Sequence, residues 1–108
     1  DFRQPDGNCA SGAPCSRATM FSIDEQAKTA TLVWQHDVGV YAPFIGSIQV
    51  LPGGHVEYDI GTFGGAAQAR VQEVTMDDAA NVVWQLDVAD SYVYRAFRIP
   101  SLYPGVQW

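Results

Sequence analysis

The feature that most constrains this chain is a five-residue phrase that occurs twice, far apart in the sequence. Residues 33–37 read Val-Trp-Gln-His-Asp, and residues 83–87 read Val-Trp-Gln-Leu-Asp. Each copy follows a strand-like run and an acidic turn, and the similarity continues downstream, where Tyr41 and Tyr94 begin matching segments. A period of about 50 residues built from short strands is typical of the blades of a β-propeller. The repeat therefore predicts an all-β fold of about two blades.

Hydrophobic patterning agrees with this fold class. No stretch shows a sustained helical period, so we expect no long helix. Short runs rich in β-branched and aromatic residues alternate with turns that contain Gly, Pro or Asp. The predicted strands cover residues 18–23, 29–35, 44–51, 55–60, 70–76 and 81–88, and a further strand is expected to open within residues 97–103.

Two blades cannot close a propeller. We therefore expect a preceding segment or a companion chain to complete the ring around the blades, which are assigned to residues 17–108. A free-standing β-sandwich-like domain made of the two copies is an alternative. It is disfavoured because two open sheets would leave flat edge strands that pair readily with other chains.

Residues 1–16 form an irregular segment rich in Gly, Pro and Ser, and this segment contains both cysteines, Cys9 and Cys15. Two thiols without a nearby histidine are too few for a structural zinc site, so no metal site is expected. A local disulfide between them is the favoured interpretation, and two free thiols are the alternative. Such a bridge indicates an oxidising setting, so we expect a secreted, periplasmic or extracellular protein.

The charge of the chain excludes some partners. The net charge is −6, with six Lys and Arg against twelve Asp and Glu, and no basic cluster is present. A nucleic-acid partner or an anionic membrane surface is therefore not expected. No apolar run approaches the roughly 20 residues that span a bilayer. The sequence has no initiator Met and no signal peptide, which is typical of a processed or excised segment.

Trp34 and Trp84 occupy equivalent places in the two copies. A stacking platform for a ligand is one interpretation. Packing of each blade against the next is favoured, because packing contacts recur with every repeat and a ligand site does not. The shared Asp37 and Asp87 are interpreted in the same way, as residues that cap turns.

Longer strings around these phrases resemble the arylsulfotransferase family. The resemblance covers the chain from about Ser16 to its end. This stretch is similar to the C-terminal portion of such proteins. It is carried by Ser16-Arg17-Ala18, Ile23-Asp24-Glu25, Val33-Trp34, the run from Tyr41 to Val56 (YAPFIGSIQVLPGGHV), Val83-Trp84-Gln85-Leu86, and the run from Tyr94 to Pro104 (YRAFRIPSLYP).

The resemblance implies a six-bladed, exported propeller enzyme. Members of the family move a sulfuryl group from an aryl sulfate ester to a phenol, without a nucleotide donor or other cofactor. A histidine in the central channel carries the group, and further histidines and an arginine hold the sulfate oxygens. An imidazole is a competent nucleophile near neutral pH, and a guanidinium matches the geometry of sulfate oxygens.

Propeller topology places His36, Tyr41, Tyr94 and Arg95 in or beside connections on the site face, and Thr62 in a loop on the same face. His36 is the catalytic candidate because Leu86 replaces it in the other copy; a solvated loop histidine is the alternative. Substrate binding is assigned to Arg95, Tyr41, Tyr94 and Thr62, and for Arg95 a salt bridge to Asp87 or Asp90 is the alternative. His55 is assigned to the opposite face, and Asp77 and Asp78 to a hairpin turn rather than a metal site.

The family mechanism needs several channel histidines, and this chain supplies one candidate. Most of the catalytic machinery is therefore expected outside it, in the remainder of the propeller. A non-enzymatic binding or scaffold propeller is the alternative function. In that case, aromatic residues at the channel mouth would bind a small aromatic or phenolic ligand, or a protein partner.

Overall fold

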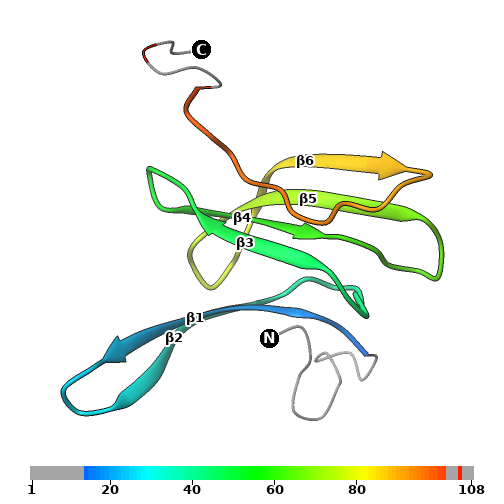
Figure 1. Cartoon of the computed structure of the whole chain (residues 1–108). Helices are drawn as coiled ribbons and strands as arrows, with labels where there is room; N and C mark the ends of the chain where they lie inside the picture. The colour runs from blue at the N-terminus through cyan, green and yellow to red at the C-terminus, as the bar shows by residue number, and fades with distance from the viewer. Residues whose placement is uncertain (1–13, 102–104, 106–108) are drawn as a thin grey trace.

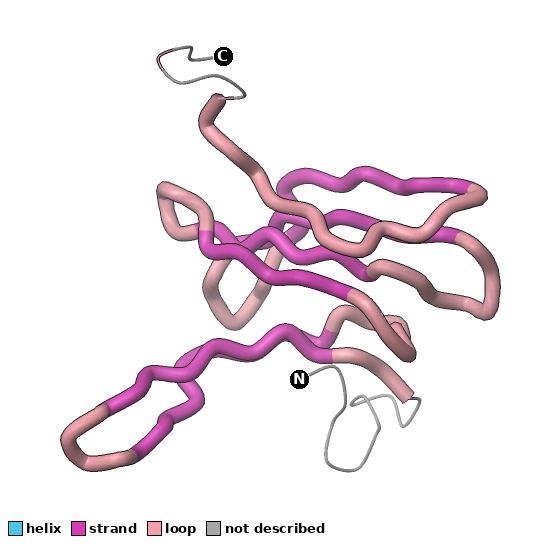
Figure 2. Tube along the Cα trace, viewed as in Figure 1, coloured by secondary structure: helices cyan, strands magenta, loops and turns pink. Residues whose placement is uncertain are grey.

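The computed structural model describes residues 14–101 and residue 105. Six strands form two antiparallel sheets, and no helix occurs among these residues (Figures 1 and 2). The prediction of an all-β fold is confirmed, and each of the six strands lies within a few residues of its expected bounds. They are β1 (Arg17–Asp24), β2 (Thr29–Asp37), β3 (Gly46–Val50), β4 (His55–Ile60), β5 (Gln68–Thr75) and β6 (Val82–Ala89).

The strands divide into a pair and a set of four. The hairpin β1–β2 is one sheet, and β3–β4–β5–β6 form the other in chain order. Figure 1 shows the hairpin against one face of the four-stranded sheet and the chain after β6 returning across the other face. The expected two blades therefore correspond to a four-stranded sheet and a two-stranded hairpin.

The repeated phrase is also a repeat of backbone geometry. The β1–β2 register shifts after the Met20–Trp34 pair, leaving Val33 as an extra residue in β2. The β5–β6 register shifts after the Glu73–Trp84 pair, leaving Val83 as an extra residue in β6. A β-bulge bends its strand and re-aims the following side chains. Because both bulges immediately precede the tryptophan, β1–β2 and β5–β6 are equivalent hairpins.

The core lies between the hairpin and the sheet. Val56 and Val74 are fully buried there, and Trp34 is 9% exposed. Burying one such aliphatic side chain stabilises the fold by about 1.5–3 kcal/mol. The Trp34 indole also donates a hydrogen bond to the carbonyl oxygen of Asp77, at 3.3 Å. The core residues are Ala18, Trp34, Ala42, Val56, Tyr58, Ile60, Val74 and Ala80.

The opposite face of the sheet is crossed by the chain that follows β6. Side chains of β3, rather than a strand, hold its backbone. The Ser47 hydroxyl accepts a hydrogen bond from the amide of Ala96 at 3.0 Å. The Gln49 side chain accepts from the amide of Arg98 at 2.9 Å and donates to its carbonyl at 3.1 Å. The further strand predicted within residues 97–103 is therefore not formed in its described part, residues 97–101.

The predicted disulfide falls partly outside this description. Cys9 and the rest of the segment up to residue 13 lie outside the described residues, so the bridge stays a prediction. Cys15 is 1% exposed. The part of the chain that is described also holds no helix able to cross a membrane.

Candidate functional site

Three loops meet at one end of the four-stranded sheet: residues 38–45, 61–67 and 90–96. The amide of Val93 donates to the carbonyl of Gly61 at 3.2 Å, which joins the second loop to the third. A Cβ atom on Gly61 would lie 2.4 Å from the Val93 oxygen and 2.5 Å from Cγ1 of Ile45, so only glycine fits here. Ile45 has φ of 55°, an uncommon conformation for a β-branched residue. These contacts place the three loops side by side at this end of the sheet.

The rim of this end carries exposed aromatic rings and one guanidinium group. The rings of Phe44 and Tyr92 lie 6.4 Å apart at an interplanar angle of 57°. The guanidinium of Arg95 lies over the ring of Tyr94, 5.2 Å from its centroid, and Tyr94 is 66% exposed. Such a surface suits a ligand with an aryl ring and an anionic group, because rings stack and a guanidinium binds paired oxygens.

The salt bridge considered for Arg95 is not formed. Among the described residues, Arg95 has no ion pair, and Asp87 is bound by Arg70, whose Nε lies 2.5 Å from a carboxylate oxygen. The hydrogen bond from Arg70, followed by one from Gln85, lowers the pKa of Asp87. Asp87 therefore fixes a strand pair, because its register partner across β5 and β6 is Arg70 itself. Arg95 keeps its donors directed to solvent and to the Tyr94 ring.

Two of the predicted contact residues, Thr62 and Tyr41, are less exposed than the rim residues. Thr62 is 6% exposed, and its hydroxyl donates to the carbonyl of Ala66 at 3.3 Å. That bond closes the loop in which Phe63 and Ala66 form an isolated bridge. Tyr41 lines a shallow pocket together with Phe63. Thr62 is therefore a loop-closing residue in this structure, while Tyr41 stays accessible beside the rim.

His36 lies in β2, beside the connecting loop rather than in it, and its side chain is half-buried, so the solvated-loop alternative is wrong. The bulge at Val33 aims Trp34 and His36 into the core, where their rings stack with centroids 6.1 Å apart. Nε2 of His36 lies 3.1 Å from the Tyr58 hydroxyl. That hydroxyl donates its hydrogen to Gln72 at 2.7 Å, so Nε2 of His36 must be the protonated nitrogen that donates to Tyr58.

Burial determines the protonation of this pair. Desolvation lowers the pKa of His36, although the nearby Asp37 carboxylate opposes the shift. Desolvation also raises the pKa of Tyr58 to about 12, with a smaller opposing effect of Arg70. Both groups are therefore neutral at physiological pH. The pair acts as a polar contact between the hairpin and the sheet.

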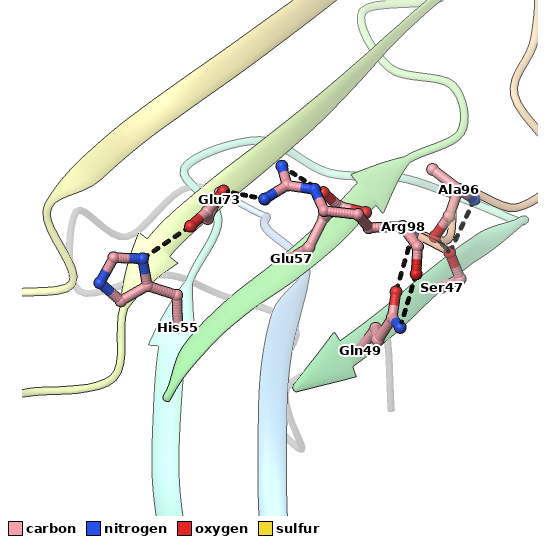
Figure 3. Close-up of polar contacts among 7 residues, drawn as sticks. All are labelled: Ser47, Gln49, His55, Glu57, Glu73, Ala96 and Arg98. Carbon is pink, nitrogen blue, oxygen red and sulfur yellow. Dashed lines mark hydrogen bonds and ion pairs between the residues drawn. The ribbon is translucent and has the colours of Figure 1, made fainter. Parts of the chain in front are cut away.

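A second polar cluster lies on the other face of the sheet, where the chain after β6 crosses it (Figure 3). Arg98 joins two glutamates: its guanidinium nitrogens lie 3.0 Å from Glu57 and 2.7 Å from Glu73. Nδ1 of His55 lies 2.6 Å from the other oxygen of Glu73. The hydrogen bond from His55 is the main cause of a lowered Glu73 pKa, and Arg98 adds to it. Because His55 begins β4, this cluster is reached from the end of the sheet opposite the rim, as predicted for His55.

One signal for this cluster becomes visible only when the strand register is known. Glu57 and Glu73 are register partners in β4 and β5, and the Glu57 side chain is only 5% exposed. Like charges directly opposite each other are destabilising unless a cation lies between them. Two facing acidic strand residues therefore call for an arginine, and Arg98 supplies it.

The described residues hold no group of three or more His, Cys, Asp or Glu side chains that could bind a metal ion. Asp77, which was assigned to a hairpin turn, does cap that turn. Its carboxylate accepts from the Thr75 hydroxyl at 2.8 Å and from the Ala80 amide at 2.9 Å. These bonds, that of Thr75 first, lower the pKa of Asp77.

Comparison with known proteins identifies the family. Residues 3–95 match the family model described as arylsulfotransferase (ASST). Neither the curated proteins nor the solved structures contain a match to this chain. The family match spans the hairpin, the whole four-stranded sheet and the rim loops up to Arg95. This chain belongs to the arylsulfotransferase family.

Proposed function

We propose that this chain is the C-terminal part of an arylsulfotransferase-like β-propeller of six blades. In this proposal, β3–β6 is one complete blade, β1–β2 is the outer half of the blade before it, and the chain after β6 enters the blade that follows. The observation that carries the proposal is the difference in exposure between the two repeated tryptophans. Trp34 is covered by the next sheet, whereas Trp84 is 44% exposed at the place where a further sheet would lie.

The proposed reaction transfers a sulfuryl group from an aryl sulfate ester to a phenolic acceptor. The S–O bond to the first phenol breaks as a bond to the histidine carrier forms, and the acceptor phenol then takes the group and releases its proton. The proposed transfer needs no cofactor. The carrier is proposed to lie outside the described residues, because Nε2 of His36, the candidate in this chain, is bound to Tyr58.

The rim is the contribution of this chain to that reaction. Arg95 is proposed to hold sulfate oxygens, and Tyr94 and Tyr41 to contact the aryl ring. The exposure of Tyr94 and the unpaired guanidinium of Arg95 among the described residues support this assignment. Thr62 contributes by holding its loop closed beside them.

The remainder of the propeller, from a preceding segment or a companion chain, is the proposed partner. An exported location, secreted, periplasmic or extracellular, is also proposed. It rests on the Cys9–Cys15 bridge and on the family. A mass measurement of the protein from its natural source, before and after reduction, tests the proposed partner and the disulfide bridge on which the proposed location rests.

The experiment that tests the function uses the assembled protein with 4-nitrophenyl sulfate as donor and phenol as acceptor. We expect release of 4-nitrophenol that depends on the added phenol. Arg95→Ala should lower kcat/KM by about 100-fold, the usual effect of removing one donor to a developing oxyanion. Lys28→Ala, in the exposed β1–β2 turn, is the matched control and should leave the rate unchanged.

A non-enzymatic binding or scaffold propeller is the second candidate. It is favoured by the rim itself, where the described residues place rings and an arginine but no histidine. Absence of turnover by the assembled protein, together with retained binding of 4-nitrophenyl sulfate, would establish this function in place of catalysis.

A further inference from the structure

The short span that carries the guanidinium group of the rim, residues 94–95, is held between two anchor points. Before it, the amide of Val93 is bonded to the carbonyl of Gly61. After it, the Ser47 hydroxyl binds both backbone polar groups of Ala96, at 3.0 Å from the amide nitrogen and 3.1 Å from the carbonyl oxygen (Figure 3). A span this short between fixed ends has little freedom, so the group that holds the Ser47 hydroxyl also helps to place the guanidinium.

That group is a carboxyl buried beneath the chain that crosses the sheet after β6. Asp59 is the register partner of Ser47 across β4 and β3, and its Oδ1 is hydrogen-bonded to the Ser47 hydroxyl. Asp59 is 3% exposed, and its other oxygen, Oδ2, is buried without a hydrogen-bond partner. Among the described residues, no cation forms an ion pair with Asp59. An ionised Asp59 would therefore be an unpaired buried charge, which is costly.

The hydrogen bonds around Ser47 are complete only if Asp59 carries a proton. The hydroxyl has one hydrogen and accepts from the Ala96 amide, so it cannot donate fully both to Asp59 and to the Ala96 carbonyl. A protonated Asp59 donates to the Ser47 oxygen, which leaves the Ser47 hydrogen for the Ala96 carbonyl. Desolvation acts in the same direction and raises the pKa of Asp59 from its ordinary value of 3.8, although the bond with Ser47 and nearby backbone amides oppose the shift.

We propose that Asp59 is a positioning residue for the reaction at the rim. Its protonated carboxyl orients the Ser47 hydroxyl, and this hydroxyl holds the backbone of Ala96. The contact fixes the direction from which the Arg95 guanidinium meets the sulfate oxygens. Asp59 does not itself touch the substrate, because it is buried. The inference rests on the role given to Arg95 in the proposed function.

The arrangement makes the rim sensitive to pH. Ionisation of Asp59 removes the donor to Ser47 and leaves a buried charge, so the anchor is intact while Asp59 is protonated. It weakens as the pH rises through the pKa of Asp59 in the folded chain. On this face, β3 contributes the uncharged Ser47 and Gln49. The other titratable or charged side chains there come from β4, β5 and the chain after β6, and are His55, Glu57, Glu73, Arg95 and Arg98.

The kinetic test uses the assembled protein with 4-nitrophenyl sulfate as donor and phenol as acceptor. Asp59→Ala should lower kcat/KM by about tenfold, because a misplaced contact residue loses much of its effect. Asp59→Asn should keep kcat/KM within about twofold, since its side-chain amide still donates to Ser47 and carries no charge. In an Arg95→Ala background, Asp59→Ala should change kcat/KM by less than about twofold, because a positioning effect requires the residue that is positioned. A merely structural role would lower kcat/KM by the same factor in both backgrounds.

The pH profile provides a second readout. For the unmodified protein, kcat/KM measured upward from about pH 4 should fall as Asp59 loses its proton. Asp59→Asn cannot ionise, so this fall should be absent from its profile. The difference between the two profiles isolates Asp59 from every other titrating group. Superimposable profiles would overturn the inference, and so would an Asp59→Asn variant as impaired as Asp59→Ala.

Amide hydrogen exchange tests the anchor without catalysis. In the same assembled protein, Asp59→Ala should speed exchange of the Ala96 amide by at least about tenfold, because its acceptor is no longer held in place. Ser47→Ala removes the anchor directly and should match Asp59→Ala in every measurement. Gln49→Ala is the matched control. Gln49 binds the same crossing chain at the backbone of Arg98, so this variant should speed exchange there and keep the pH profile of the unmodified protein.

The inference and the proposed function can fail separately. Turnover that Asp59→Ala leaves intact, or lowers equally with and without Arg95, would overturn the inference while the proposed activity stands. Absence of turnover in the unmodified protein would overturn the proposed activity. The same comparison is then made with the Kd of 4-nitrophenyl sulfate, and a loss of affinity in Asp59→Ala that disappears in the Arg95→Ala background would support the inference.

Discussion

Arg98 shows how a single residue is fixed by partners that are distant in sequence. Its role depends on two glutamates more than 20 positions away. The opposition of Glu57 to Glu73 follows only from the β4–β5 register, which the geometry of the loop at residues 61–67 helps to set. Local patterns carry no information on that register, so the cluster was not predicted.

Arg98→Ala should destabilise the fold by about 1–3 kcal/mol, because it leaves the buried Glu57 carboxylate without its cation. The expected loss is smaller than that for a fully buried ion pair, because the Arg98 side chain is 45% exposed and partly screened by solvent. Urea unfolding measures the change. Arg95→Ala is the control and should change stability by less than about 0.5 kcal/mol. Adding Glu57→Gln to Arg98→Ala should recover part of the loss, and no recovery would show that the charge of Glu57 is not the cause.

His36 makes stability depend on pH in a defined window. Its pKa in the folded chain lies below the ordinary value of 6.5, so the unfolded chain binds more protons between these two values. The contribution of neutral His36 is therefore complete above about pH 6.5 and is lost as the pH falls through the folded pKa. The carboxylate of Glu73 titrates separately, because its pKa is lowered from 4.5.

His36→Leu, which copies Leu86 of the other hairpin, should remove this dependence. The Tyr58 hydroxyl keeps Gln72 as its acceptor, so we expect a change within about 1 kcal/mol at pH 8. Urea midpoints measured from pH 8 to pH 5 should fall more steeply for the unmodified chain than for the variant. Parallel curves would mean that another group is responsible for the slope.

Among the structural elements, the strands followed from the sequence and the way they are grouped did not. Alternation and turn residues located all six strands, because each pattern is local. The repeat also identified two equivalent hairpins. It did not reveal that β1–β2 forms a separate two-stranded sheet, which packs on the face of β3–β6 instead of extending it. Nor did it show the chain after β6 bound by Ser47 and Gln49, because these residues replace a strand by side-chain hydrogen bonds.

Gly61 joins these elements, and Gly61→Ala tests its role. The added Cβ would overlap the Val93 carbonyl and Ile45, so we expect a loss of about 1–3 kcal/mol, the usual effect of overpacking. The Val93 amide should also exchange faster, because its bond to Gly61 breaks. Gly54→Ala is the control: it has open space around it and a φ of 88°, so it strains its own turn without touching Val93. Unchanged exchange at Val93 in Gly61→Ala would contradict this assignment.

At the scale of the whole molecule, the described residues form a packed interface and leave other surfaces open. The packed interface joins β1–β2 to the sheet through Trp34 and the His36–Tyr58 pair. Among the open surfaces are the edge of β1 and the face that carries Trp84 and Leu86, which are 44% and 47% exposed. Each of these two surfaces is a partly built copy of a contact that the chain completes elsewhere. This is the pattern expected of a segment from a larger ring of repeated units.

The two tryptophans allow this pattern to be tested by measurement. Because they are structurally equivalent, their contributions to stability should differ only through their neighbours. In the isolated chain, Trp34→Ala should destabilise the fold by about 3–5 kcal/mol, the range for a buried aromatic residue. Trp84→Ala should cost about 1 kcal/mol, since its ring is half exposed and contacts Arg98 at 5.6 Å. In the proposed propeller a further blade would cover Trp84, so the two losses should become similar there. Equal losses in the isolated chain would show that Trp84 is already buried, whereas a difference that persists after assembly would show that no blade packs against it.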